Sequence, residues 1–162
     1  MTEHEQQLLI WAQGQCARQE YSRRQMYQRL AKRGASQEEC NYILSALEDD
    51  GFINELRFAR AFVHDKFHFE KWGRLKIAFK LSADHQIAQS IINAALTQLE
   101  AEAELSLLEE LLLAKLKSVD PLTPEAKLKL FHFAEQRGFT KTQIYAVLKK
   151  INDEKTSQCV SE

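Results

Sequence analysis

Apolar residues recur three and four positions apart along most of the chain, which is the spacing of helices with one buried face. The clearest example lies between positions 54 and 70 and comprises Leu56, Ala59, Phe62, Val63 and Phe67. The pattern predicts helices over 5–19, 22–33, 36–50, 54–70, 73–81, 85–98, 101–118, 124–137 and 140–151. Only 5 Gly and 2 Pro occur in 162 residues, which leaves little for the turns of a sheet. The expected fold class is therefore all-α.

Several predicted helix starts carry a Ser/Thr-x-x-Glu/Gln capping box, in which two side chains satisfy backbone N–H groups that the first turn leaves unpaired. The pairs are Ser22 with Gln25, Ser36 with Glu39 and Thr140 with Gln143. Thr123 precedes Pro124, and proline is well suited to the first helical position because its missing N–H costs nothing there. Four helix starts are placed in this way.

One arrangement of turn and helix occurs three times. Turns at Gly34, Ala83 and Gly138 are each followed, 13 positions later, by an apolar residue of the next helix: Leu47, Leu96 and Ile151. The copies are separated by 49 and 55 residues, which suits about three helices per unit. We therefore expect three tandem three-helix repeats over 5–53, 54–99 and 100–151. The segment 152–162 has almost no apolar residues and is expected to be a disordered tail.

The first residues are too polar for a signal peptide, and no apolar run is long enough to span a membrane. A cytoplasmic protein is expected. Cys16, Cys40 and Cys159 lack the Cys-x-x-Cys spacing of zinc and redox motifs. Cys16 and Cys40 fall on apolar stripes, which is typical of small core residues in a reducing compartment.

Charge is unevenly distributed although the net charge is only −1. Positions 14–80 hold thirteen Lys and Arg against nine Asp and Glu. Basic residues gather on the predicted helices 22–33 and 73–81, as Arg23, Arg24, Arg29, Lys32, Arg33, Arg74, Lys76 and Lys80. These side chains could simply be the solvated faces of surface helices. Alternatively, they form a basic surface suited to a nucleoprotein partner, whose phosphates would add salt-dependent affinity.

A helix, a short turn containing Gly34 and a second helix also suggest a DNA-reading helix-turn-helix. The charges argue against that interpretation. The second helix, which starts at Ser36, carries five acids and no Lys or Arg: Glu38, Glu39, Glu48, Asp49 and Asp50. Such a helix would be repelled by the two phosphate backbones that flank a major groove.

His64 and His68 are four residues apart, which is zinc-ligand spacing on a helix. No third ligand is evident downstream, and both histidines also fit the wet flank of an amphipathic helix. No glycine-rich phosphate loop, Gly-x-Ser-x-Gly elbow or carboxylate pair occurs. We expect no enzyme, no metal site and no cofactor.

Residues 49–63, Asp-Asp-Gly-Phe-Ile-Asn-Glu-Leu-Arg-Phe-Ala-Arg-Ala-Phe-Val, followed by Trp-Gly-Arg-Leu-Lys-Ile at 72–77, closely resemble the central signature of the RecX family. The segment 22–34 resembles another family segment, with Gln25-Met26 in place of Glu-Leu. The resemblance covers about 8–151. It departs at 80–83, where the family has a Lys-Gly-Ile-like turn, and at Asn54, where Asp is frequent.

The resemblance implies an elongated, curved array of three three-helix modules that regulates the RecA recombinase. Family members lie in the groove of the RecA filament on single-stranded DNA and restrain its ATP hydrolysis, strand exchange and extension, in recombination and SOS DNA repair. The partner is then the RecA filament, with weak direct DNA contact, and a monomer is expected. The predicted contacts are Arg57, Arg60, Arg74, Lys76 and Lys80, with Arg23, Arg24, Lys32 and Arg33 behind them. Whether such a protein bridges protomers or caps the filament end stays open.

Alternatives remain for these residues and for the function. Arg57 and Arg60 could pair with nearby acids, whereas Arg74, in a first helical turn, has no evident stabilising role. Trp72 is expected to pack structurally. The protein could be a stand-alone helical DNA-binding regulator. It could also be an interaction repeat that uses the acidic helix 100–118, with its leucine face partly exposed rather than packed between modules.

Overall fold

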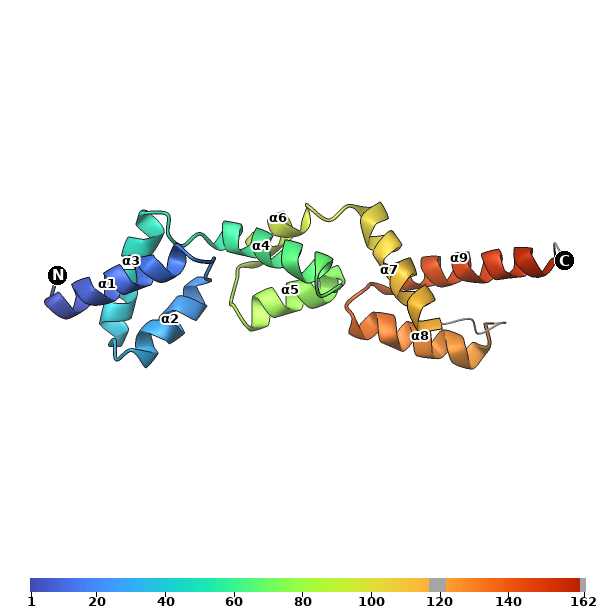
Figure 1. Cartoon of the computed structure of the whole chain (residues 1–162), viewed down its shortest axis with the longest axis horizontal. Helices are drawn as coiled ribbons and strands as arrows, with labels where there is room; N and C mark the ends of the chain where they lie inside the picture. The colour runs from blue at the N-terminus through green and yellow to red at the C-terminus, as the bar shows by residue number, and fades with distance from the viewer. Residues whose placement is uncertain (117–121, 161–162) are drawn as a thin grey trace. The chain divides into compact units, whose positions relative to one another are not determined.

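The computed structural model describes residues 1–116 and 122–160, and the side chains up to Ser157. These residues form nine α-helices and no strand (Figure 1), so the all-α prediction is confirmed. The helices are α1 (Glu3–Cys16), α2 (Arg23–Lys32), α3 (Gln37–Asp49), α4 (Glu55–His68), α5 (Arg74–Ala83), α6 (Gln89–Leu96), α7 (Ala101–Leu116), α8 (Pro124–Gln136) and α9 (Lys141–Val160).

The predicted capping interactions are present. The three capping boxes are Ser22 with Gln25, Ser36 with Glu39 and Thr140 with Gln143. Thr123 caps α8 ahead of Pro124. Asn54 Oδ1 accepts from the Arg57 N–H at 2.9 Å, so the asparagine caps α4 as an aspartate would. A further capping box begins α1, which therefore starts two residues earlier than predicted.

The turns after α2 and α8 have the same geometry. Gly34 and Gly138 have φ of +91° and +96°, and the residue after each donates to a carbonyl five residues back, Ala35 to Leu30 and Phe139 to Ala134. The proposed equivalence of Ala83 with these glycines is wrong. Ala83 is still helical, and the positive φ falls on Gln86, at +52°. Because that turn is displaced, α6 begins at Gln89 rather than at 85.

The prediction of a disordered tail from 152 is wrong for 152–160, which continue α9 as far as Val160. Lys and Glu in this stretch are good helix formers, and the Thr156 hydroxyl donates to the Asn152 carbonyl at 2.9 Å, within the helix. The low apolar content of this stretch means that it adds little to a core, but it does not prevent the stretch from being helical. Residues 161–162 lie outside the described part of the chain.

The chain divides into two compact units, each described by itself. Unit 1 comprises Met1–His64 and Lys80–Ala95, and unit 2 comprises Asp65–Phe79 and Leu96–Glu162. The helices α4 and α5 each contribute residues to both units. The second predicted repeat, 54–99, is thus shared between the two units, and the boundaries of the three repeats stay a prediction.

Unit 1 is built on the packing of α1, α2 and α3 (Figure 1). Its core includes Met26 and Leu30 from α2 with Ile43, Leu44 and Leu47 from α3, all inaccessible to solvent. Burying such side chains contributes about 1.5–3 kcal/mol each. Cys40 is also fully buried in this core, as its place on the apolar stripe predicted.

Unit 2 is built on α7, α8 and α9, which pack against one another. The leucine face of α7 is largely buried, since Leu108 and Leu112 are inaccessible and Leu116 is 7% exposed. They belong to a core that includes Phe139 and Ile144. Leu105 and Leu111 of the same face are half-buried. Packing within the unit is therefore favoured over a face left partly exposed for a partner. Positions 117–118 of the predicted helix lie outside the described residues.

Two glycines make a close backbone contact within unit 2. The Gly73 N–H donates to the Arg137 carbonyl at 2.7 Å, and the Leu75 N–H donates to the Gly138 carbonyl at 2.9 Å. A Cβ at Gly73 would lie 2.5 Å from the Gly138 carbonyl carbon. Only glycine allows this approach, so Trp72-Gly73-Arg74 is a packing motif that attaches the start of α5 to the turn before α9.

Candidate functional site

The nine predicted contact residues fall into both units. Unit 2 holds Arg74 and Lys76, and unit 1 holds the other seven. Each unit therefore has a basic set of its own, and a single surface formed by all nine stays a prediction. The structure does determine which of these cations are already engaged inside the fold.

Arg57 stabilises the turn between α3 and α4. Its Nε donates to Glu20 Oε1 at 2.5 Å, and its Nη2 donates to the carbonyls of Gly51 at 3.0 Å and Phe52 at 3.3 Å. Three acceptors therefore share this guanidinium. The acid that pairs with Arg57 is Glu20, in the segment before α2, rather than a neighbour on its own helix.

Arg74 holds a buried carboxylate. Its Nε donates to Glu104 Oε1 at 2.7 Å, while Gln143 Nε2 donates to Glu104 Oε2 at 2.6 Å. The Glu104 side chain is only 4% exposed, and burying an ionised carboxylate is costly unless it is paired. Arg74 thus links α5 to α7 and α9, and the premise that it has no stabilising role does not hold.

Other predicted contacts are partly engaged. Arg23 Nε donates to Glu48 Oε1 at 2.6 Å, and Lys80 Nζ lies 3.7 Å from Asp84 Oδ2. Both pairs are solvent-exposed enough that each contributes little to stability. A phosphate could therefore compete for Arg23 and Lys80 at small cost.

Two predicted contacts stack on tryptophans. Arg33 lies over the Trp11 ring at 4.3 Å, and Lys76 lies over the Trp72 ring at 4.4 Å, with Lys66 also over Trp72 at 4.9 Å. Trp72 is half-buried among these side chains, which agrees with its predicted structural role. A cation held in this way keeps its charge at the surface while its stem is fixed.

Four predicted contacts have side chains with neither a hydrogen bond nor an ion pair among the described residues. Two of them, Arg33 and Lys76, stack on tryptophans, and the other two are Arg24, which is half-buried, and Lys32, which is exposed. Arg60 is also exposed, on α4, and has interactions within the fold. Sequence analysis did not select Arg29, which donates to the Tyr21 hydroxyl at 2.8 Å and lies over its ring. Arg29 is thus largely structural.

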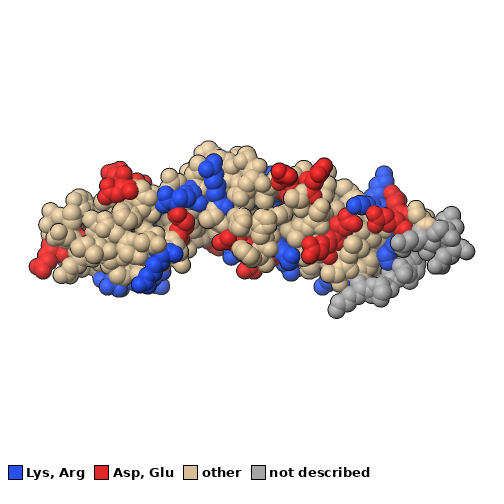
Figure 2. Space-filling view, turned by 45° about the horizontal axis from the view of Figure 1, so that its top comes forward, with Lys and Arg blue, Asp and Glu red and all other residues tan. Residues whose placement is uncertain are grey.

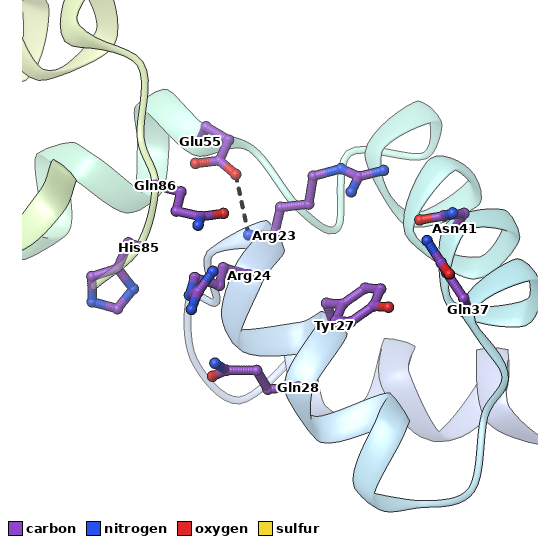
Figure 3. A pocket seen from close by; sticks show the side chains of 9 residues that line it. All are labelled: Arg23, Arg24, Tyr27, Gln28, Gln37, Asn41, Glu55, His85 and Gln86. Carbon is purple, nitrogen blue, oxygen red and sulfur yellow. Dashed lines mark hydrogen bonds between the residues drawn. The ribbon is translucent and has the colours of Figure 1, made fainter. Parts of the chain in front are cut away.

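Arg23 and Arg24 both line a cleft in unit 1 of about 420 Å³ (Figure 3). Arg24, Tyr27 and Gln28 reach it from α2, Gln37 and Asn41 from α3, Glu55 from the start of α4, and His85 and Gln86 from the turn before α6. A guanidinium, an aromatic ring and several amides could bind an anion or a polar planar group. Sequence reasoning missed all the lining residues outside α2, because folding brings them together from distant segments.

Glu55 and His85 form the polar wall of this cleft. Burial raises the pKa of the Glu55 carboxyl, and the Arg23 N–H, which donates to Oε1 at 3.2 Å, opposes the shift only in part. His85 Nδ1 is hydrogen-bonded to the buried Ser22 hydroxyl at 3.0 Å, and its ring packs 4.8 Å from that of Phe58. The imidazole is thereby fixed against the α2 start.

Acidic and basic side chains are intermixed on the face shown in Figure 2. Among the described residues, no group of three or more His, Cys, Asp or Glu is placed to hold a metal ion. His64 and His68 are both exposed on α4. No described helix is long and apolar enough to cross a membrane. These features define an all-α helical-repeat protein whose distinctive surface chemistry is a set of arginines and lysines.

Comparisons with known proteins identify the family. A family model described as "RecX, second three-helix domain" matches residues 54–96. Regulatory protein RecX of Chromohalobacter salexigens is 32% identical over 129 residues, covering 79% of this chain and 82% of that protein. Regulatory protein RecX of Halorhodospira halophila is 30% identical over 132 residues, covering 80% and 79%. The chain belongs to the RecX family.

A solved structure has the same fold. The crystal structure of RecX from Lactobacillus salivarius superposes with a TM-score of 0.82, covering 94% of this chain and 99% of that one. The two sequences are 18% identical. The helical-repeat architecture predicted from the recurring turns is therefore confirmed.

Proposed function

We propose that this chain regulates the RecA recombinase by binding in the groove of the RecA filament on single-stranded DNA. There it restrains ATP hydrolysis, strand exchange and filament extension, in recombination and SOS DNA repair. Membership of the RecX family, at about 30% identity over four fifths of the chain, is the observation that carries this proposal. The protein acts by binding and needs no catalytic residue of its own.

The surface charge supports a partner that is both protein and nucleic acid. A protein that binds free DNA on electrostatics alone usually presents a strongly basic face. Here the net charge is −1, and acids are intermixed with bases on the face shown in Figure 2. A filament groove presents recombinase side chains beside phosphates, so a mixed surface fits it better.

We expect the contact energy to come chiefly from cations that the fold leaves available. Arg24 and Lys32 would gain a phosphate partner without losing an internal one. Arg57 and Arg74 would have to leave Glu20 and Glu104. The four predicted contacts Arg33, Arg60, Lys76 and Lys80 keep part of their charge at the surface and would add to binding.

The test compares two double charge reversals of equal size. Arg24→Glu with Lys32→Glu removes the two available cations of α2, whereas Lys129→Glu with Lys141→Glu changes exposed lysines outside the predicted contact set. Binding to RecA filaments on single-stranded DNA is measured by sedimentation at several salt concentrations. The α2 variant should bind at least tenfold more weakly and with a shallower salt dependence, because phosphate contacts set that slope. Equal binding by both variants would overturn the proposed contact surface.

A further inference from the structure

Besides the face that packs in the core of unit 2, α8 and α9 carry a second apolar face, and the buried Leu148 borders both. Leu130 and Ala134 of α8, with Ile144, Val147 and Ile151 of α9, point inward and are buried. A different face of the same two helices forms a groove of about 620 Å³. It is lined by Pro124, Lys127, Leu128, Phe131 and His132 of α8 and by Tyr145, Leu148, Lys149 and Asn152 of α9.

The spacing of these residues shows that the groove is a continuous feature of both helices. The α8 residues follow the steps 124, 127, 128, 131 and 132, and the α9 residues follow 145, 148, 149 and 152. Each series is one helix face. Leu128 is 58% exposed and Tyr145 is 62% exposed, and the Phe131 ring lies 5.3 Å from that of Tyr145. Large apolar side chains gathered on one groove are a mark of an interaction site.

The charge at the groove has one sign. Its charged lining residues are Lys127 and Lys149, and no carboxylate lines it. The neighbouring Lys150 is not part of it and is paired with Glu109 at 2.8 Å, on the side of α7. A matching occupant therefore carries apolar anchors flanked by Asp or Glu.

We infer that this groove binds an amphipathic helical segment of the recombinase subunit, with acidic residues flanking its apolar anchors. A groove between two helices accepts the apolar face of a third. Its lining is mainly apolar, and Leu128 and Leu148 add aliphatic side chains beside the rings of Phe131 and Tyr145, so the groove suits the apolar face of a helix. The inference rests on the proposed function, and it gives unit 2 the protein contact while the available cations of α2 meet DNA.

The test replaces groove side chains and matched residues elsewhere. Leu128→Ser with Tyr145→Ser removes the exposed anchors. Leu113→Ser with Tyr42→Ser is the control, because these residues are 46% and 48% exposed and lie outside the groove. Affinity for RecA filaments on single-stranded DNA is measured with a labelled chain, after thermal denaturation confirms that each variant is folded.

The groove variant should bind roughly tenfold or more weakly, and the control should bind within about twofold of the original chain. Lys127→Glu with Lys149→Glu should weaken binding as well, whereas Lys129→Glu with Lys141→Glu should not. If the original chain binds the filament and the groove variants match it, the inference is wrong while the proposed function stands. If the original chain does not bind, both fail.

A second copy of this chain is the competing occupant of the groove, and analytical ultracentrifugation detects the resulting self-association. If the original chain dimerises at the assay concentration and Leu128→Ser with Tyr145→Ser abolishes the dimer without changing filament affinity, the groove is an interface between copies. That result would also overturn the inference. A monomer at all concentrations, together with the expected loss of filament affinity, would support it.

Discussion

Gly73 and Gly138, 65 positions apart in sequence, lie backbone against backbone in unit 2. A Cβ at Gly73 would be 2.5 Å from the carbonyl carbon of Gly138, and one at Gly138 would overlap the Lys76 side chain and backbone. The contact places the start of α5, with Arg74 and Lys76, against the turn before α9. The signature Trp72-Gly73-Arg74 is therefore explained by packing.

We expect Gly73→Ala to destabilise the protein by about 2–4 kcal/mol, because the crowding atoms are backbone and cannot move aside independently. Gly14→Ala is the control. Gly14 lies within α1 with no heavy atom within 4 Å of an added Cβ, so alanine there should stabilise by about 0.5–1 kcal/mol. Urea unfolding measures both. Similar small effects at the two positions would contradict the contact.

Arg74→Met should lower the free energy of unfolding by about 2 kcal/mol, because it leaves the Glu104 carboxylate buried with Gln143 as its remaining partner. Adding Glu104→Gln should recover part of this loss by removing the buried charge. A double-mutant cycle in urea tests the coupling. If Arg74→Met costs the same with Glu or Gln at 104, the pair does not stabilise the fold.

The same pair affects how functional variants are interpreted. Arg74→Glu would set a second carboxylate against Glu104, so a loss of RecA regulation in that variant would reflect unfolding as much as a lost contact. Lys76→Glu and the α2 reversals do not have this problem, since none of them disrupts a buried ion pair.

Glu55 should make stability depend on pH. Burial raises its pKa in the folded chain above the ordinary value of 4.5. Between 4.5 and the higher folded-state pKa, the folded state holds more protons than the unfolded state. The free energy of unfolding therefore falls as pH rises through this window. Glu55→Gln removes that titration while an amide oxygen can still accept from the Arg23 N–H.

The advantage of Glu55→Gln over the original chain should therefore grow as pH rises from 4.5 through the raised folded-state pKa and reach a plateau above it. Urea unfolding of both proteins between pH 4 and pH 7 gives the difference in their free energies of unfolding. The contributions of the other titrating groups are common to both proteins and largely cancel. A difference that stays constant, or that shrinks with rising pH, would contradict a raised pKa.

The parts of the fold that depend on local chemistry could be predicted from the sequence. Capping boxes placed helix starts, and Gly34 and Gly138 identified equivalent turns, because positive φ strongly favours glycine. The second turn was misplaced because Gln86, which carries no such signal, adopts the positive φ there. The last part of α9 was missed because the prediction relied on apolar residues, whereas intrinsic helix propensity can maintain a helix without burial.

The candidate site could be predicted only as a set of residue types. Glu20 with Arg57, Glu48 with Arg23 and Glu104 with Arg74 are separated by 37, 25 and 30 positions, so the spacing rules of a single helix do not reveal them. The groove on α8 and α9 did have a signal. Leu128 and Phe131 lie on a different helical face from Leu130 and Ala134, and two apolar faces on one helix indicate two packing partners.

The central claim is that this chain restrains the RecA filament, and the most direct measurement is the ATPase rate of the cognate RecA on single-stranded DNA with substoichiometric amounts of the chain. We expect a clear fall in rate. The fall should be weaker for Arg24→Glu with Lys32→Glu and unchanged for Lys129→Glu with Lys141→Glu. An unchanged ATPase rate, with no chain sedimenting with the filament, would contradict the account.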